Sequence, residues 1–345
     1  MKYALALGGG GTRGAFQVGV WEALNELGIE VSAIAGTSVG AINGAAFASG
    51  ADAKELWLDI TAADIAETDG DNMFSPASLI SMLKKIPEGG LESDSFKSML
   101  NERIDESAVR NSDIIYGLCT YRADTRKGEE LFLDNIPEGE LNDYIFASAC
   151  LPFFKAAEIE GAKYYDGGLY NNLPIDMLIE KGYDTIISVS VKGVGLVRAV
   201  DNCGVNIIEI NCKTPEVGLM EFDRNAISES IKSGYYECMR VFGKYSGEYY
   251  SIDSDSYKST QLRFGADIIS GLEEAAMMCE IDRYRVYTVG ELLGCVLEKY
   301  KSVLRLRLMT AAMEKNLPGR GALDSLGKLF RAANAIIYLP KYDIP

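Results

Sequence analysis

Two short apolar segments near the start of the chain each lead through glycines into a helical pattern. Residues 3–7 (YALAL) and 31–35 (VSAIA) have the length and composition of buried strands. The stretches that follow them, 12–28 and 39–50, carry apolar residues at helical spacing. A strand, helix, strand, helix order requires parallel strands joined by right-handed crossovers. The sequence therefore predicts an α/β fold.

The rest of the chain separates into two parts by its composition. Residues 52–108 have a helical pattern with a polar face, and one long helix is expected over 221–243. Strand-like runs occur at 114–121, 130–133, 157–165, 185–192 and 205–211. A connector rich in Tyr, Ser and Asp follows residue 244, and the last part of the chain is mainly helical in pattern. We therefore expect an α/β domain over residues 1–243 and a helical C-terminal region over 244–345.

Histidine is absent from all 345 residues. This excludes a Ser-His-Asp triad, a histidine-ligated metal and an imidazole base. The seven cysteines are widely spaced and form no C-x-x-C pair, which favours reduced structural thiols over a disulfide framework or a zinc site. Catalysis by this chain must therefore use another base, and we expect no metal.

The charge and the apolar segments limit the partners and the location. A formal net charge of −16 argues against general binding of nucleic acid, which requires clustered Lys and Arg. The N-terminus lacks the features of a secretory signal, and no apolar run reaches the ~18 residues that a membrane-spanning helix needs. We therefore predict a cytoplasmic protein. The sequence gives no prediction of the oligomeric state.

A G-x-S-x-G pattern, Gly36 to Gly40 (GTSVG), follows the second predicted strand. Glycines on both sides of Ser38 allow a sharp turn from strand to helix that exposes the serine hydroxyl. The N-terminus of the following helix would stabilise negative charge developing there. Because the pattern is short, a plain structural turn is the competing interpretation, but its position favours Ser38 as a nucleophile.

The glycine-rich loop after the first strand has two possible uses. Gly9, Gly11 and Gly14 fit the dinucleotide-binding pattern G-x-G-x-x-G, which also requires an acidic residue at the end of the second strand. Glu30 precedes that strand instead. The backbone N–H groups of Gly9 to Gly11 could alternatively form an oxyanion hole. Arg13 could steady this loop or contact an anionic substrate group, or it could be an ordinary surface charge.

The stretch YYDGGLYNNLP, residues 164–174, contains a candidate base. Asp166 follows strand-like residues and precedes two glycines, so an ordinary Asp-Gly turn is one interpretation. A serine hydrolase without histidine needs a base that contacts the serine directly. A carboxylate can fill this role if burial raises its proton affinity. The hypothesis is that Asp166 is this base.

Four motifs in this order resemble those of the patatin-like phospholipases. They are GGGTRG at 9–14, GTSVG at 36–40, ASACLPFFKA at 147–156 and Asp166-Gly167-Gly168, which NNLP follows. The resemblance covers roughly residues 3–215 and leaves the C-terminal region unexplained. It implies a three-layer α/β/α fold with a mainly parallel sheet.

The resemblance also implies an activity and its residues. It implies a cofactor-free Ser-Asp dyad that hydrolyses acyl esters of phospholipids, lysophospholipids or other lipids through an acyl-enzyme. Carried over, Ser38 is the nucleophile, Asp166 the base and Gly9, Gly10 and Gly11 the oxyanion donors. The supporting residues are Arg13, Gly36, Gly40, Gly167 and Gly168. An esterase or acyltransferase acting on a smaller substrate, a catalytically silent interaction protein and a dinucleotide-binding module are the alternatives.

Two apolar stretches bear on lipid contact. Residues 76–86 are expected to form a helix that packs in the core or walls an acyl-chain site. Residues 291–345 carry nine Lys or Arg against five Asp or Glu, and the segment 325–339 mixes apolar and basic residues. A basic amphipathic helix there could make peripheral membrane contact or pack on the acidic α/β domain. The sequence favours packing.

Overall fold

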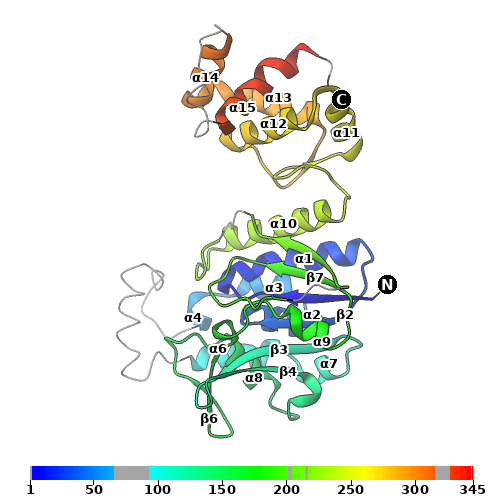
Figure 1. Cartoon of the computed structure of the whole chain (residues 1–345). Coiled ribbons are helices and arrows are strands. Elements are labelled where there is room, and N and C mark those ends of the chain that lie inside the picture. Colours follow the sequence, from blue (N-terminus) through cyan, green and yellow to red (C-terminus); the bar gives the residue numbers. More distant parts are fainter. Residues whose placement is uncertain are drawn as a thin grey trace. The chain divides into compact units, whose positions relative to one another are not determined.

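A computed structural model describes residues 2–65, 93–200, 204–213, 217–314, 327–342 and 344. The helix expected over 76–86 lies outside the described residues. The chain divides into two compact units, Met1–Cys238 and Met239–Pro345 (Figure 1). The division falls within helix α10 (Arg224–Val241), the long helix that the sequence predicts over 221–243. The domain boundary at 243/244 stays a prediction.

The N-terminal unit is built around one eight-stranded sheet. Its main order is β5-β6-β3-β2-β1-β7-β8, and β4 pairs with β3. The pairs from β3 through β2, β1 and β7 to β8 are parallel, whereas β4, β5 and β6 pair antiparallel. The predicted α/β class with a mainly parallel sheet is therefore confirmed. The strands are β1 (Tyr3–Leu7), β2 (Val31–Thr37), β3 (Ile115–Arg122), β4 (Lys127–Phe132), β5 (Ala157–Ile159), β6 (Ala162–Asp166), β7 (Thr185–Ser190) and β8 (Asn206–Asn211).

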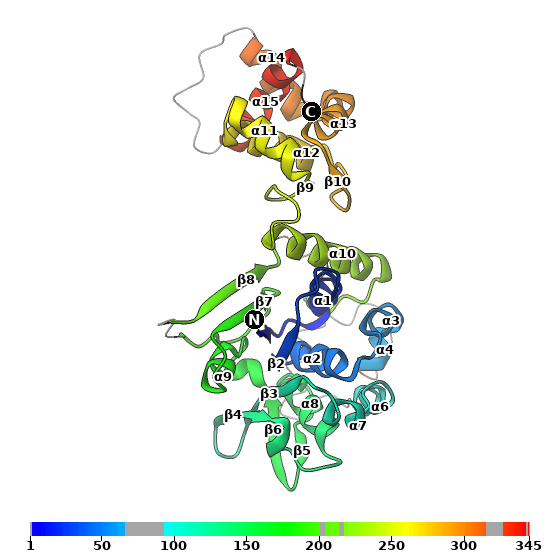
Figure 2. The ribbon, with the colours of Figure 1, turned by 90° about the vertical axis from the view of Figure 1, so that its right-hand side faces the viewer.

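Helices cover both faces of this sheet (Figure 2). Successive side chains of a strand point to opposite faces. On β3, Tyr116 faces Gly44 of α2 (Val39–Ser49), whereas a methyl group on Gly117 would contact Met177 of α9 (Ile175–Glu180). This arrangement gives the expected three layers. Within the described residues of the unit, the other α-helices are α1 (Ala15–Glu26), α3 (Ala53–Asp59), α4 (Ala62–Ile65), α6 (Asp94–Arg103), α7 (Glu106–Arg110) and α8 (Leu141–Ala149).

Helices α1 and α10 cross at backbone contact because each has a glycine there. A methyl group on Gly19 would lie 1.8 Å from the carbonyl oxygen of Ile231. One on Gly234 would lie 1.9 Å from the carbonyl oxygen of Phe16. Neither position has room for a side chain, so this pair of glycines fixes where α10 packs on the α/β core.

The C-terminal unit is mainly helical, as predicted. It contains α11 (Ser254–Phe264), α12 (Ala266–Met278), α13 (Val289–Lys299), α14 (Leu304–Glu314), α15 (Gly327–Tyr338) and the short strands β9 (Ser251–Ile252) and β10 (Val286–Tyr287). The predicted basic amphipathic segment includes α15, which packs closely on α12 because a methyl group on Gly271 would lie 2.3 Å from the carbonyl oxygen of Arg331. Ala332, Ala335 and Ile336 are buried in the core of this unit.

Candidate active site

Strand pairing brings Ser38 and Asp166 together from distant parts of the sequence. Strand β2 ends at Thr37, which pairs with Cys119 of β3. Strand β6 ends at Asp166, which pairs with the next residue of β3, Thr120. Because β2 runs parallel and β6 antiparallel to β3, their C-terminal ends meet head to head along β3. The residue after β2, Ser38, therefore faces the last residue of β6.

Ser38 has the strained backbone that the flanking glycines were expected to allow. Its φ is 56° and its ψ is −126°, and α2 begins at the next residue. A methyl group on Gly36 would lie 2.2 Å from the carbonyl oxygen of Gly40, and one on Gly40 would lie 2.2 Å from that of Leu7. Both glycines are thus sterically required. Strained backbone of this kind is concentrated at functional sites.

The backbone N–H of Ser38 is held by a second serine. It donates to Oγ of Ser148 at 2.9 Å, and that hydroxyl donates in turn to the carbonyl oxygen of Cys119 at 2.7 Å. Ser148 is completely buried at the end of α8. The sequence motif ASACLPFFKA contains Ser148, but its spacing gave no indication of this contact. The bridge ties the strained turn to β3.

Asp166 is a buried carboxyl group with one oxygen unused. Its side chain is 5% exposed. Oδ1 accepts a hydrogen bond from the N–H of Gly168 at 2.7 Å, whereas Oδ2 makes no hydrogen bond of standard geometry among the described residues. Burial raises the pKa of Asp166 from 3.8 to about 6, against the opposing influence of the Ser38 hydroxyl and the Gly168 N–H.

The turn after Asp166 is packed too closely for any residue but glycine at its first position. A methyl group on Gly167 would lie 2.1 Å from the carbonyl oxygen of Cys119. A methyl group on Gly168 would lie 2.9 Å from Oδ1 of Asn172. Asn172 also accepts the N–H of Gly9 at 3.0 Å through its carbonyl oxygen. This asparagine therefore joins the aspartate turn to the glycine loop.

The three predicted oxyanion donors differ in what their N–H groups do. The N–H of Gly9 is occupied by Asn172, and a methyl group on Gly9 would lie 3.0 Å from Cβ of Ser38. The N–H groups of Gly10 and Gly11 have no acceptor in the described part of the chain. Gly11 has a φ of +57°, and a methyl group there would lie 1.9 Å from the carbonyl oxygen of Leu219. The loop thus offers two open N–H groups rather than three.

The structure does not place the acidic side chain of Glu30 near the glycine loop, where dinucleotide binding would require it. Glu30 precedes β2, and its carbonyl oxygen accepts the N–H of Tyr3 at the start of β1. The glycine loop follows the C-terminal end of β1. Since β1 and β2 are parallel, Glu30 lies at the opposite end of the strands from the loop.

Arg13 connects the glycine loop to two segments that follow later strands. Its Nη1 donates to the carbonyl oxygen of Lys192 at 2.8 Å and its Nε to that of Val217 at 3.2 Å. Arg13 thereby joins the segments that follow β7 and β8. Two of the three guanidinium nitrogen atoms of Arg13 donate to backbone carbonyl oxygens, so its geometry does not support a contact with an anionic substrate group.

A buried network of polar side chains, which the sequence did not predict, holds the backbone at the start of the glycine loop. Trp57 Nε1 donates to Asn43 Oδ1 at 2.8 Å, and Asn43 Nδ2 donates to Gln17 Oε1 at 2.8 Å. Gln17 Nε2 then donates to the carbonyl oxygen of Gly8 at 2.7 Å. The available signal was Asn43 itself, a polar residue in an otherwise apolar helical run of small residues.

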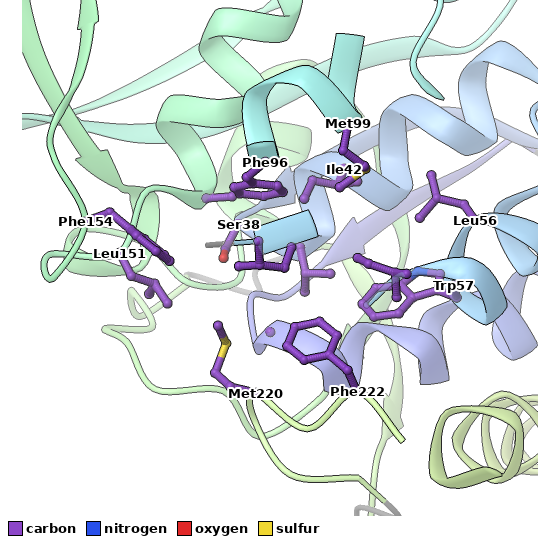
Figure 3. Close-up of a pocket in the computed structure, with 15 residues that line it drawn as sticks. Ser38, Ile42, Leu56, Trp57, Phe96, Met99, Leu151, Phe154, Met220 and Phe222 are labelled. Carbon is purple, nitrogen blue, oxygen red and sulfur yellow. The ribbon is translucent and has the colours of Figure 1, made fainter. Parts of the chain in front are cut away.

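Ser38 lies in an apolar groove that encloses about 550 Å³ of space, part of it open to solvent. Among the described residues that line the groove, Ser38 is the one with a hydroxyl or charged side chain (Figure 3). The lining also includes Gly11, Val39, Ile42, Leu56, Trp57, Ile60, Ile65, Phe96, Met99, Ala149, Leu151, Phe154, Met220 and Phe222. Such a groove suits a hydrocarbon chain better than a charged or sugar-containing group.

The described residues contain no cluster of three or more Cys, Asp or Glu side chains that could hold a metal ion. Within those same ranges, no helix has both the length and the apolar character to cross a membrane.

Comparison with known proteins gives one family. The family model described as Patatin-like phospholipase matches residues 5–179. Patatin-like phospholipase domain-containing protein 7 of Rattus norvegicus is 31% identical over 191 residues, which are 54% of this chain and 13% of that protein. An NTE family protein of Mycobacterium tuberculosis is 29% identical over 194 residues, 56% of this chain and 49% of that protein. Lysophospholipase nte1 of Aspergillus terreus is 55% identical over 53 residues, 15% of this chain and 4% of that protein. The chain thus matches less than half the length of each of these relatives.

Proposed function

The chain belongs to the patatin-like phospholipase family, and from this premise we propose that it is a lipid acyl hydrolase acting through Ser38 and Asp166. The observation that carries the proposal is the open oxygen of Asp166. This atom is buried, belongs to a carboxyl group with a pKa of about 6 and lies at the strand end that faces Ser38. A base needs such an unoccupied acceptor and a pKa near the working pH.

In the proposed first step, Asp166 accepts the hydroxyl proton of Ser38 as the serine oxygen attacks the ester carbonyl carbon. The protonated carboxyl group then gives its proton to the departing alcohol, which leaves an acyl-enzyme on Ser38. Asp166 next takes a proton from water, which attacks the acyl carbonyl. The fatty acid leaves and Ser38 regains its proton. No cofactor takes part in these steps.

The negative charge on the carbonyl oxygen needs donors in both steps. We assign this role to the N–H groups of Gly10 and Gly11, which have no acceptor among the described residues. The N-terminus of α2, which begins directly after Ser38, adds a favourable dipole. Gly9 has a different role here: its lack of a side chain lets the loop approach Ser38.

The substrate class follows from the groove. A groove whose described lining is apolar except for the serine would bind an acyl chain and position its ester carbonyl at Ser38. An ester or acyl-transfer substrate with a short acyl group would leave much of this apolar surface uncovered. A catalytically silent interaction protein would have no use for an unpaired buried carboxylate oxygen, which is costly to maintain.

The test is labelling with a fluorophosphonate probe followed by hydrolysis of a lipid panel. We expect Ser38→Ala to abolish labelling and hydrolysis, and Ser259→Ala, which alters an exposed serine of the C-terminal unit, to change neither. A panel of phospholipids, lysophospholipids and neutral glycerides then defines the head group. Labelling of the wild type that persists in Ser38→Ala contradicts the proposal.

Cytoplasmic location and peripheral membrane contact through residues 325–339 are further proposals. Among the described side chains of α15, Ala332, Ala335 and Ile336 pack inside the C-terminal unit and are not available for such a contact. Arg331 forms an ion pair with Glu274. Lys328 and Tyr338 are exposed and could take part in it.

A further inference from the structure

The segment that follows β7 displays apolar side chains to solvent. Val194 is 84% exposed, Leu196 63% and Val197 60%. Most large apolar side chains of the described residues are buried. The others that are more than half exposed are Leu262 (89%), Leu308 (59%), Leu304 (58%) and Tyr338 (51%), and no three of these lie within four positions. Three large apolar residues exposed within four positions form a patch, and exposed apolar patches mark interaction sites. We call Val194, Leu196 and Val197 the apolar patch.

The backbone of this segment is pinned to the candidate active site. The N–H of Leu196 donates to the carbonyl oxygen of Gly168 at 2.8 Å, and the N–H of Asn172 donates to that of Leu196 at 2.5 Å. A methyl group on Gly193 would lie 1.9 Å from the carbonyl oxygen of Gly9. The backbone that carries the apolar patch is therefore fixed by contacts with both the aspartate turn and the glycine loop, while the side chains of the patch are exposed to solvent.

The same region is connected to the wall of the acyl groove. Arg13 donates to the carbonyl oxygen of Lys192, which precedes the patch, and to that of Val217, the first residue of the 217–222 segment. That second segment supplies Met220 and Phe222 to the groove lining (Figure 3). One side chain thus links the exposed apolar surface to the surface that would bind the acyl chain.

The charge around the patch favours contact with phosphate-bearing head groups. Residues 191–200 contain no Asp or Glu, although the chain has 50 acidic residues and a net charge of −16. Lys192 Nζ donates to a carbonyl oxygen, that of Lys213, and has no carboxylate partner among the described residues. Arg198 is paired with Asp176 at 2.8 Å and Glu130 at 3.4 Å. Strongly anionic surfaces would be repelled by the chain as a whole.

We propose that the apolar patch docks the protein on the surface of a zwitterionic phospholipid membrane. Val194, Leu196 and Val197 would insert among the acyl chains while Lys192 meets lipid phosphates. A substrate chain could then pass from the membrane to the groove without full exposure to water. The role in delivering substrate rests on the proposed hydrolase function, whereas the docking itself does not require Ser38 to react.

The test is binding of the full-length Ser38→Ala protein to phosphatidylcholine vesicles in a sedimentation assay. Adding Val194→Ser, Leu196→Ser and Val197→Ser together should lower the partition coefficient by about 100-fold, given the apolar surface withdrawn from the membrane. The control is Leu262→Ser, which removes a leucine that is 89% exposed and lies outside the patch, and it should leave binding unchanged. Equal vesicle binding by the triple variant and its parent overturns the proposal, as does failure of the parent to bind.

A second measurement separates docking from catalysis. In the active protein, the triple variant should hydrolyse a soluble short-chain ester like wild type and lose hydrolysis of phosphatidylcholine vesicles. If wild type hydrolyses neither ester, the hydrolase proposal fails. Vesicle binding by the Ser38→Ala protein, with and without the three patch substitutions, still tests the docking proposal. If instead the patch changes self-association in sedimentation velocity and leaves vesicle binding unchanged, the surface serves a protein contact and the lipid proposal is wrong.

Discussion

Asp166 in the N-terminal unit and Glu273 in the C-terminal unit both carry buried carboxyl groups, and the two groups are used differently. Asp166 in the N-terminal unit is 5% exposed and Glu273 in the C-terminal unit is 2% exposed. Burial raises the pKa of both. Oε1 of Glu273, however, accepts three backbone N–H groups, from Glu248, Tyr249 and Tyr250, each at 2.9 Å. Burial and a raised pKa therefore do not identify a base by themselves.

The difference lies in the acceptor capacity that remains. Glu273 projects from α12 into the turn before β9 and holds that turn together with its hydrogen bonds. Asp166 accepts one N–H and leaves Oδ2 open beside Ser38. A structural carboxylate is satisfied by its own fold, whereas a catalytic one keeps an acceptor for a proton that moves.

Asp166→Asn should lower kcat by about 10³-fold, because an amide cannot accept the serine proton. Glu273→Gln is the matched control: it also neutralises a buried carboxylate, and we expect its kcat to stay at the wild-type level. Steady-state hydrolysis of a soluble ester measures both variants, with circular dichroism to verify the fold. If the two substitutions reduce kcat equally, the distinction between the two carboxylates is wrong.

Asp166→Asn should also stabilise the protein at high pH. Since the pKa of Asp166 is raised from 3.8 to about 6, the folded state binds this proton more tightly than the unfolded state. Its favourable contribution is present at low pH and is lost as the pH rises through about 6. Removing the charge should therefore gain up to about 3 kcal/mol at pH 8, and the gain should shrink as the pH falls through about 6.

Thermal unfolding of wild type and variant across this pH range measures the effect. Asp124→Asn is the control, because Asp124 is exposed and its hydrogen bond from Arg122 lowers its pKa. It should give no gain at pH 8. A pH-independent difference between wild type and Asp166→Asn would contradict the raised pKa.

Glu273→Ala should lower the stability of the C-terminal unit by about 2 kcal/mol and leave kcat unchanged, because it strands buried N–H groups. Both tryptophans, Trp21 and Trp57, lie in the N-terminal unit. The denaturant concentration at the midpoint of the transition followed by far-UV circular dichroism should therefore fall. The midpoint of the transition followed by tryptophan fluorescence should stay the same. A shift in the fluorescence transition alone would rule out a role confined to the C-terminal unit.

The sequence predicted the parts of the site that belong to short motifs. The glycines around Ser38 and after Asp166 stand in such motifs, and Gly36 is required by a contact within its own turn, with Gly40. Gly40 and Gly167, however, are required by contacts with Leu7 and Cys119 of other strands. The alternation of apolar runs and helical patterns predicted the sheet and its layers. These patterns can be recognised in residues near one another in the chain, although the contacts that require two of the glycines are distant.

The parts that the sequence could not predict depend on partners far away in the chain. The N–H of Gly9 is taken by Asn172, and Arg13 spans two segments that follow later strands. No pattern within the glycine loop distinguishes an occupied N–H from an open one. The tertiary contact decides it, which is why the predicted set of three oxyanion donors reduces to Gly10 and Gly11 as a proposal.

Ser148 is such a distant partner, and it gives the smallest expected effect. Its hydroxyl accepts the N–H of Ser38 and donates to Cys119, so Ser148→Ala would free the amide of a residue at a φ of 56°. The nucleophile would then be held less firmly, and we expect kcat to fall about tenfold with little change in KM. Ser95→Ala is the control, because the Ser95 hydroxyl is buried without a hydrogen bond in the described part of the chain. A loss of stability without a loss of kcat would make Ser148 a purely structural residue. Its buried hydroxyl group would then have the same kind of role as the carboxyl group of Glu273, which holds a turn in place.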